Sequence, residues 1–156
     1  MVSAEYLRRI VIAHAAFLLR KPGGKRADFR KLDLSGVRLS GVNLSSALFG
    51  DALVRAGEFI GCTLVGVDAS FTNFEEAAFI GCDMRRIRAR SASFLRANIS
   101  GCDLRDGDFH AENSNETSVA LNSTSFAGAS FVSIDIAGRV PGRGVGGIGG
   151  DGPRAL

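Results

Sequence analysis

An apolar residue occupies every fifth position of this chain from residue 29 to residue 109, and this period limits the possible folds more than any other feature. The series consists of Phe29, Leu34, Leu39, Leu44, Phe49, Val54, Phe59, Leu64, Ala69, Phe74, Phe79, Met84, Ala89, Phe94, Ile99, Leu104 and Phe109. A second series of smaller residues lies two positions before each of these, and Thr72 is its only polar member. A period of five fits neither the apolar spacing of an α-helix nor the alternation of a simple strand. The pattern therefore predicts a repeat architecture.

The two series predict a coil with four short sides. Residues two apart in an extended segment point the same way, so the small and the large residue of each repeat both face inward. The three residues between repeats turn a corner. Four sides give a square coil of about twenty residues, and stacked coils would lie about 4.8 Å apart with their polar residues facing water.

The repeats ADFRK, LDLSG, VRLSG and VNLSS resemble the pentapeptide-repeat family, whose consensus is Ala, Asp or Asn, Leu or Phe, and two polar residues. The resemblance covers residues 27 to 138. It implies the all-β fold of that family, a right-handed quadrilateral β-helix. The handedness comes from the resemblance alone.

Residues 1–26 are expected to form an N-terminal capping helix and a linker. Ser3 can cap a helix whose apolar residues recur at helical spacing, and Pro22-Gly23-Gly24 ends it. A signal peptide fits poorly, because Arg20-Lys21 occupies the place of a small-residue cleavage site. The segment is also too short and too charged to span a bilayer. A repeat stack needs caps, so we expect this helix to cover the open end of the first coil.

The repeat register breaks once, because Phe109 and Leu121 are twelve residues apart where ten would keep phase. We therefore expect a two-residue insertion that forms a polar loop at residues 110–120. Leu121, Phe126, Phe131 and Ile136 then resume the repeat for one last coil. The composition of residues 139–156 predicts a flexible Gly-rich tail.

Three cysteines, Cys62, Cys82 and Cys102, are spaced by one coil and should stack in one inward column. Parallel side chains about 4.8 Å apart suit neither a relaxed disulfide nor, without histidines nearby, a metal site. We expect buried free thiols in place of alanine. This usage favours a reducing compartment, so the prediction is a cytoplasmic protein or part of an intracellularly assembled particle.

The formal net charge of +3 is distributed unevenly. Residues 1–26 carry +5, residues 139–156 carry +2, and the body between them carries −4. Within the body opposite charges recur one coil apart, as in Asp68, Arg88 and Asp108, in Arg55 and Glu75, or in Arg86 and Asp106. Exposed pairs contribute about 0 to 1 kcal/mol each, so these ladders shape the surface field more than the stability.

No catalytic, cofactor or metal site is expected. The only histidines, His14 and His110, have no nucleophile partner at a suitable spacing. The many carboxylates occupy outward positions, where they lack the burial that adjusts a pKa for acid–base catalysis. The C-terminal glycines follow no strand and open no helix, so they predict no phosphate loop.

Two classes of non-enzymatic function remain. The favoured class is a β-helical scaffold that binds another protein or assembles on a larger particle such as a virion. The alternative, raised by the resemblance, is a DNA mimic that binds DNA gyrase and protects it from quinolones. A mimic needs acidic rows in place of phosphates, and here arginines interrupt those rows. Neither direct nucleic-acid binding nor membrane binding is expected.

Outward apolar residues mark the candidate contact positions. Ile60, Ala78 and Ile80 would form a flat apolar strip on one side, and Phe71 is a separate candidate. The last coil would expose Phe126, Phe131 and Ile136 beside unpaired backbone groups. Uncovered strand edges invite pairing with another chain, so a homodimer through the C-terminal coil is a further expectation.

Overall fold

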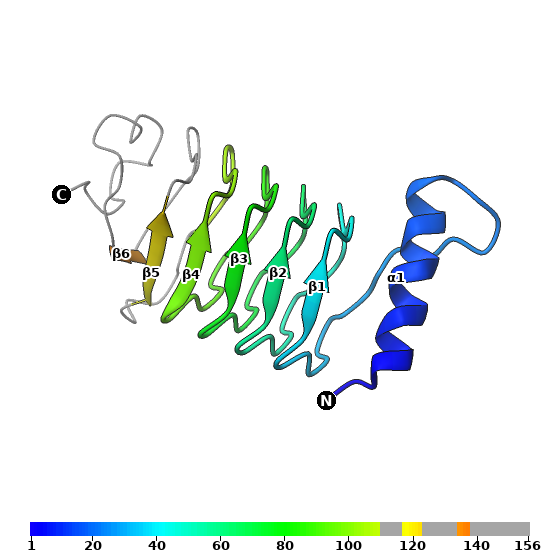
Figure 1. Cartoon of the computed structure of the whole chain (residues 1–156), viewed down its shortest axis with the longest axis horizontal. Helices are drawn as coiled ribbons and strands as arrows, with labels where there is room; N and C mark the ends of the chain where they lie inside the picture. The colour runs from blue at the N-terminus through cyan, green and yellow to red at the C-terminus, as the bar shows by residue number, and fades with distance from the viewer. Residues whose placement is uncertain (110–116, 123–133, 138–156) are drawn as a thin grey trace.

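The five-residue repeat winds into a stack of coils, and a helix lies at the N-terminal end of the stack (Figure 1). A computed structural model describes residues 1–109, 117–122 and 134–137. The helix, α1, runs from Ala4 to Leu18. The strands are β1 (Arg38–Ser40), β2 (Glu58–Ile60), β3 (Ala78–Ile80), β4 (Ala97–Ser100), β5 (Thr117–Asn122) and β6 (Ile134–Ala137).

One side of each coil contributes a strand to a single parallel sheet with the strand order β1 to β6. Leu39 pairs with Phe59, Phe59 with Phe79, and Phe79 with Ile99, so each partner lies 20 residues further along the chain. Isolated parallel bridges with the same offset join the other sides of the coils. This offset confirms the predicted coil length.

The predicted inward residues form the core. Every member of the large apolar series is buried except Leu39, which is half-buried in the first coil. Phe59 and Phe79 stack with ring centroids 4.9 Å apart and an interplanar angle of 7°. Thr72 is fully buried, and its hydroxyl donates to the Phe49 carbonyl at 2.9 Å. The one polar residue of the small series is therefore satisfied inside the stack.

The corners of the coils adopt a left-handed backbone. Every fifth residue from Lys31 to Asp106 has a φ between +51° and +68°. Some of these residues are glycines, such as Gly81, but others carry a side chain, such as Ala56 and Phe71. This conformation disfavours residues with a Cβ by about 1 to 2 kcal/mol each. The stack therefore holds many corner residues in a strained conformation.

Replacing Gly81 with alanine is expected to lower the free energy of unfolding by about 1 to 2 kcal/mol through backbone strain, because nothing lies within 4 Å of an added Cβ. Gly50 is the matched control, since its φ is not left-handed and an added Cβ would meet Ser70 O at an ordinary 3.7 Å. We expect Gly50→Ala to be neutral or stabilising. Urea unfolding measures both, and an equal loss of stability in the two variants would contradict the strain argument.

Helix α1 begins as predicted, because the Ser3 side chain accepts a hydrogen bond from the Tyr6 N–H at 3.1 Å. Its half-buried residues Leu7, Ile10 and Val11 pack against the core. The backbone N–H of Lys25 donates to the Ala13 carbonyl at 3.0 Å, which ties the following segment back to the helix. No helix among the described residues is long and apolar enough to cross a membrane.

His14 joins the helix to the first coil, and its ring is fully buried. Nδ1 accepts a hydrogen bond from the Ala27 N–H at 2.9 Å, and Nε2 lies 3.1 Å from the Ser45 carbonyl. The neutral ring with its hydrogen on Nε2 satisfies both partners. Burial lowers the pKa of His14, and the charge of Arg26 lowers it further, against the opposing effect of the Ser45 bond.

The repeat register changes where the sequence predicts it. Ile99 on β4 pairs with Leu121 on β5, so the offset rises from 20 to 22 residues. Residues 117–120, which the expected loop at 110–120 includes, lie on β5, and residues 110–116 lie outside the described residues. The last coil also departs from the repeat. Ile136 lies on β6 opposite Val119, only 17 residues away, whereas the repeat would place it on another side of the coil.

Candidate functional site

The sheet carries a strip of outward-facing apolar side chains, formed by Ile60, Ala78 and Ile80. Ile60 and Ile80 are direct partners on β2 and β3. Their exposed fractions are 46% and 44%, although isoleucine side chains are usually buried. Ala78 is half-buried on the same strand as Ile80. The structure thus brings together the three residues that the sequence placed on one side, and we call them the sheet strip.

Polar residues border the sheet strip. Ser40 precedes Ile60 in the outward row, and Ser100 follows Ile80. In the neighbouring row, Glu58 forms an ion pair with Arg38 at 3.3 Å. An apolar patch with a polar rim is typical of protein contact surfaces.

Acidic side chains of the body are paired with cations. Between residues 28 and 108, every Asp and Glu except Asp51 and Asp106 forms an ion pair. The predicted partners Asp68 and Arg88 lie 3.6 Å apart, whereas Arg86 forms no ion pair with Asp106 among the described residues. The negative charge of the body is therefore neutralised locally and forms no continuous acidic row in the described coils.

A family model of pentapeptide repeats matches residues 25–45, 47–88 and 70–106, with eight copies. These segments cover more than half of the chain. The chain belongs to the pentapeptide-repeat family. A search of curated proteins finds no significant match to the sequence.

Solved structures of pentapeptide-repeat proteins have the same fold. QnrB1, a plasmid-mediated fluoroquinolone resistance protein, superposes with a TM-score of 0.54 at 20% identity, over 69% of this chain and 61% of that chain. The match thus spans less than two thirds of QnrB1. The protein alr5209 from Nostoc Pcc 7120 has a TM-score of 0.53 at 26% identity, over 64% of this chain and 85% of that chain. The fold is a right-handed quadrilateral β-helix.

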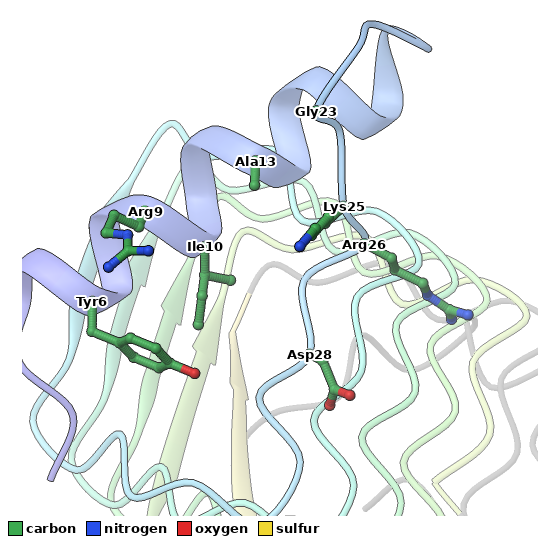
Figure 2. A pocket seen from close by; sticks show the side chains of 8 residues that line it. All are labelled: Tyr6, Arg9, Ile10, Ala13, Gly23, Lys25, Arg26 and Asp28. Atoms are coloured by element: carbon green, nitrogen blue, oxygen red, sulfur yellow. The ribbon is translucent and has the colours of Figure 1, made fainter.

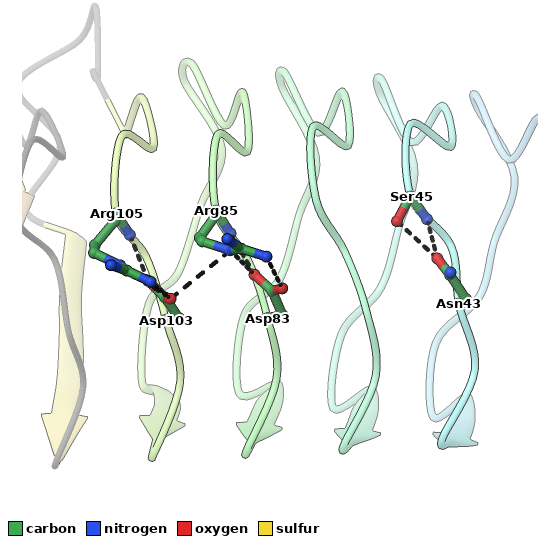
Figure 3. A network of polar contacts seen from close by, with 6 residues as sticks. All are labelled: Asn43, Ser45, Asp83, Arg85, Asp103 and Arg105. Carbon is green, nitrogen blue, oxygen red and sulfur yellow. Dashed lines mark hydrogen bonds and ion pairs between the residues drawn. The ribbon is translucent and has the colours of Figure 1, made fainter.

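The Asp or Asn of the pentapeptide repeat has a local structural role that the sequence argument missed. Its side-chain oxygen accepts a hydrogen bond from the backbone N–H two residues later. Figure 3 shows this contact at Asn43 (3.0 Å), Asp83 (3.3 Å) and Asp103 (3.1 Å). Asp and Asn stabilise turns by such bonds. These outward residues therefore stabilise the corners of the pentapeptide coil besides facing water.

Arginines at two of these corners also pair with the turn carboxylates. Arg85 binds both oxygens of Asp83, at 2.8 and 2.7 Å, and reaches Asp103 of the next coil at 3.8 Å (Figure 3). The hydrogen bond to the arginine lowers the pKa of Asp83, and the equivalent bond to Arg105 lowers that of Asp103. These arginines are thus engaged on the surface of the stack.

Phe71 is more exposed than the sheet strip, at 57%, and occupies a strained corner with a φ of +58°. It lies half a coil beyond the corner at Gly61, so it is not part of the sheet strip. Leu53, which the sequence argument missed, is 46% exposed and bridges Asn73, two residues after Phe71. Its outward position in the pentapeptide register could have identified it.

The C-terminal candidates cannot be placed on a surface. Phe126 and Phe131 lie outside the described residues, as does the predicted tail at 139–156. Ile136 lies on β6, the last strand of the described sheet. The predicted dimer through the C-terminal coil therefore stays a prediction.

The three cysteines are buried free thiols, as predicted. Each thiol donates to a carbonyl of the preceding coil, with distances of 3.4 Å for Cys62, 3.2 Å for Cys82 and 3.3 Å for Cys102. The hydrogen-bonded neighbour Cys102, together with burial, raises the pKa of Cys82 to about 11. Cys82 and burial likewise raise the pKa of Cys62. Among the described residues, no group of three or more His, Cys, Asp or Glu could hold a metal ion.

Alkylation of the native protein with iodoacetamide at neutral pH is expected to leave all three cysteines unlabelled. All three thiols are buried, so the reagent cannot reach them in the folded protein. The thiolate is the reactive form, and the raised pKa values of Cys62 and Cys82 disfavour it further. The pKa of Cys102 is lowered by its hydrogen bond with Cys82, so its protection depends on burial alone. Mass spectrometry measures the label, and the same treatment in denaturant should modify every cysteine. Rapid labelling without denaturant, or a mass lowered by a disulfide, would contradict this prediction.

Proposed function

We propose that this pentapeptide-repeat protein is a non-catalytic scaffold that binds another protein through the sheet strip. The observation that carries the proposal is the exposed pair Ile60 and Ile80 on adjacent strands of one parallel sheet. Adjacent coils present them in register, so a partner can bury both against one surface. Three free buried thiols agree with a reducing compartment such as the cytoplasm.

The alternative is gyrase-directed DNA mimicry. The fold likeness to QnrB1, a fluoroquinolone resistance protein, supports considering it. Against it, the arginine partners neutralise the carboxylates that would imitate phosphates. Duplex DNA carries uncompensated charges at regular spacing, which the paired surface of these coils does not reproduce. We therefore favour the scaffold.

The test compares the wild-type protein with Ile60→Asp/Ile80→Asp and with a control, Asn43→Asp/Asn73→Asp, which adds the same charge at turn positions outside the sheet. The tagged proteins are used to isolate partners from cells of the source organism. We expect one protein to be retained by the wild type and the control but lost from the strip variant, because two buried carboxylates would be unpaired. Identical retention by all three would contradict binding through the sheet strip.

A supercoiling assay with DNA gyrase and a quinolone separates the two candidates. The scaffold proposal predicts no effect of the protein on quinolone inhibition. Dose-dependent rescue of supercoiling by the wild-type protein would favour the mimic instead. Loss of that rescue after acidic side chains are neutralised would assign it to surface charge.

A further inference from the structure

We propose that the groove between α1 and the segment after it is a second binding site, which takes an acidic peptide segment of a protein partner. The groove has a volume of about 450 Å³ and is lined by Tyr6, Arg9, Ile10, Ala13, Gly23, Lys25, Arg26 and Asp28. Figure 2 shows that Tyr6, Arg9 and Ile10 project from the helix, while Lys25 and Asp28 belong to the facing segment. The site is thus built from two segments of the chain.

The groove has an excess of positive charge. Arg9 and Lys25 form no ion pair within the part of the chain that the structure describes. Arg26 is anchored by a hydrogen bond from its Nε to the Ser46 carbonyl. Asp28, the only carboxylate that lines the groove in the described part of the chain, is already bound by Arg30, at 2.9 and 2.6 Å. An incoming carboxylate would therefore meet unpaired cations from both sides of the groove.

The groove also has apolar surface and continues along the first coil. Ile10 and Ala13 are half-buried in its wall, and Tyr6 is 46% exposed at its edge. Tyr6 and Asp28 also line a neighbouring hollow of about 510 Å³, together with Arg30, Lys31 and Leu32. Both hollows are lined by cationic and apolar side chains, which suits an extended peptide with acidic and apolar side chains.

Other anionic ligands fit the groove less well. Sites for single-stranded nucleic acid usually stack successive bases on several aromatic side chains. Among the described residues, Tyr6 is the only aromatic one that lines either hollow. A single small anion would use one cluster of cations and leave the apolar contacts unused. An acidic peptide uses both kinds of contact.

This site is separate from the sheet strip, so the two proposals can fail independently. The experiment uses the full chain and a fluorescein-labelled peptide in which glutamates are interspersed with leucine and serine. The test variant is Arg9→Gln/Lys25→Gln. The matched control is Arg8→Gln/Lys21→Gln, which removes the same charge from exposed residues beside the groove that do not line it.

Fluorescence anisotropy is expected to show saturable binding that the test variant weakens about tenfold and the control less than about twofold. Raising the salt from about 0.05 to about 0.3 M should weaken binding to the wild type. A peptide with lysine in place of glutamate should not bind. Circular dichroism melting curves check that both variants remain folded.

Three outcomes would overturn the proposal. If the test and control variants weakened peptide binding equally, the binding would be due to general electrostatic attraction by the basic N-terminal region and not to the groove. If the wild-type protein showed no saturable binding of the acidic peptide, the groove would not be a peptide-binding site. Tighter binding of an oligothymidylate than of the acidic peptide, with the same sensitivity to the test variant, would assign the groove to nucleic acid.

Discussion

Replacing Phe79 with alanine is expected to lower the free energy of unfolding by about 3 to 5 kcal/mol. The side chain is 1% exposed and contacts three other rings, with Phe59 at 4.9 Å, Phe74 at 5.3 Å and Phe94 at 6.2 Å between centroids. Its removal would open a cavity that the surrounding coils cannot close without losing their backbone register. Chemical denaturation followed by circular dichroism measures the loss.

The next residue along β3 gives the control for this prediction. Ile80 is also large and apolar, but it points outward and is 44% exposed. We expect Ile80→Ala to cost less than about 1 kcal/mol, because the residue is already 44% exposed and its removal opens no enclosed cavity. If Phe79→Ala and Ile80→Ala destabilised the protein equally, the inward and outward assignment of the repeat would be wrong.

Lowering the pH from about 8 to about 5 is expected to destabilise the protein through His14. The folded state holds this ring neutral with a lowered pKa, whereas the unfolded chain takes up a proton near the ordinary value of 6.5. Protonated Nδ1 would direct its hydrogen at the Ala27 N–H and lose that hydrogen bond. The stability is therefore fully present above pH 6.5 and falls below it, by up to about 1.4 kcal/mol per pH unit, down to the lowered pKa.

Urea unfolding across this range, with His14→Gln and His110→Gln, tests the assignment. These are the only two histidines in the chain. The pH dependence should disappear in His14→Gln and persist in His110→Gln. The paired aspartates titrate lower, because their arginine partners lower the pKa values of Asp28, Asp83 and Asp103. A pH dependence that survived His14→Gln would show that another group causes it.

The coil could be predicted from the sequence because an apolar residue occupies every fifth position from residue 29 to residue 109. The burial of each of these residues depends only on its place within its own repeat. Phe79 and Cys82 could be placed from their position in the five-residue period. The role of His14 could not, because it depends on contacts with Ala27 and Ser45, which only the docking of the helix brings together. Asp83 shows another limit. Its outward position in the repeat already accounts for a polar side chain there. The sequence pattern therefore does not predict that its carboxylate also accepts a hydrogen bond from the backbone N–H of Arg85 at the corner.

The departure of β6 from the repeat has a similar origin. The apolar residues after Leu121 keep the five-residue spacing, but the offset between β5 and β6 is set by backbone pairing. The five-residue spacing does not determine whether a residue such as Ile136 lies on the sheet or on the next side of the coil. The candidate contact residues could be grouped from the sequence, because a coil of twenty residues places Ile60 and Ile80 on one side and Phe71 half a coil away. The exposed fraction of each side chain could not be predicted in this way, because it depends on the packing around that position.

The offset of 20 residues that β1 to β4 share sets distances along this part of the stack in equal steps. Each coil of 20 residues advances the stack by one strand and returns the chain to the same side, so inserting or deleting one coil shifts everything beyond it by about 4.8 Å with little rotation. The distance between the groove at the helix and the sheet strip is therefore set by the number of intervening coils. Evolution can adjust that distance in fixed steps while the chemistry of both surfaces stays the same.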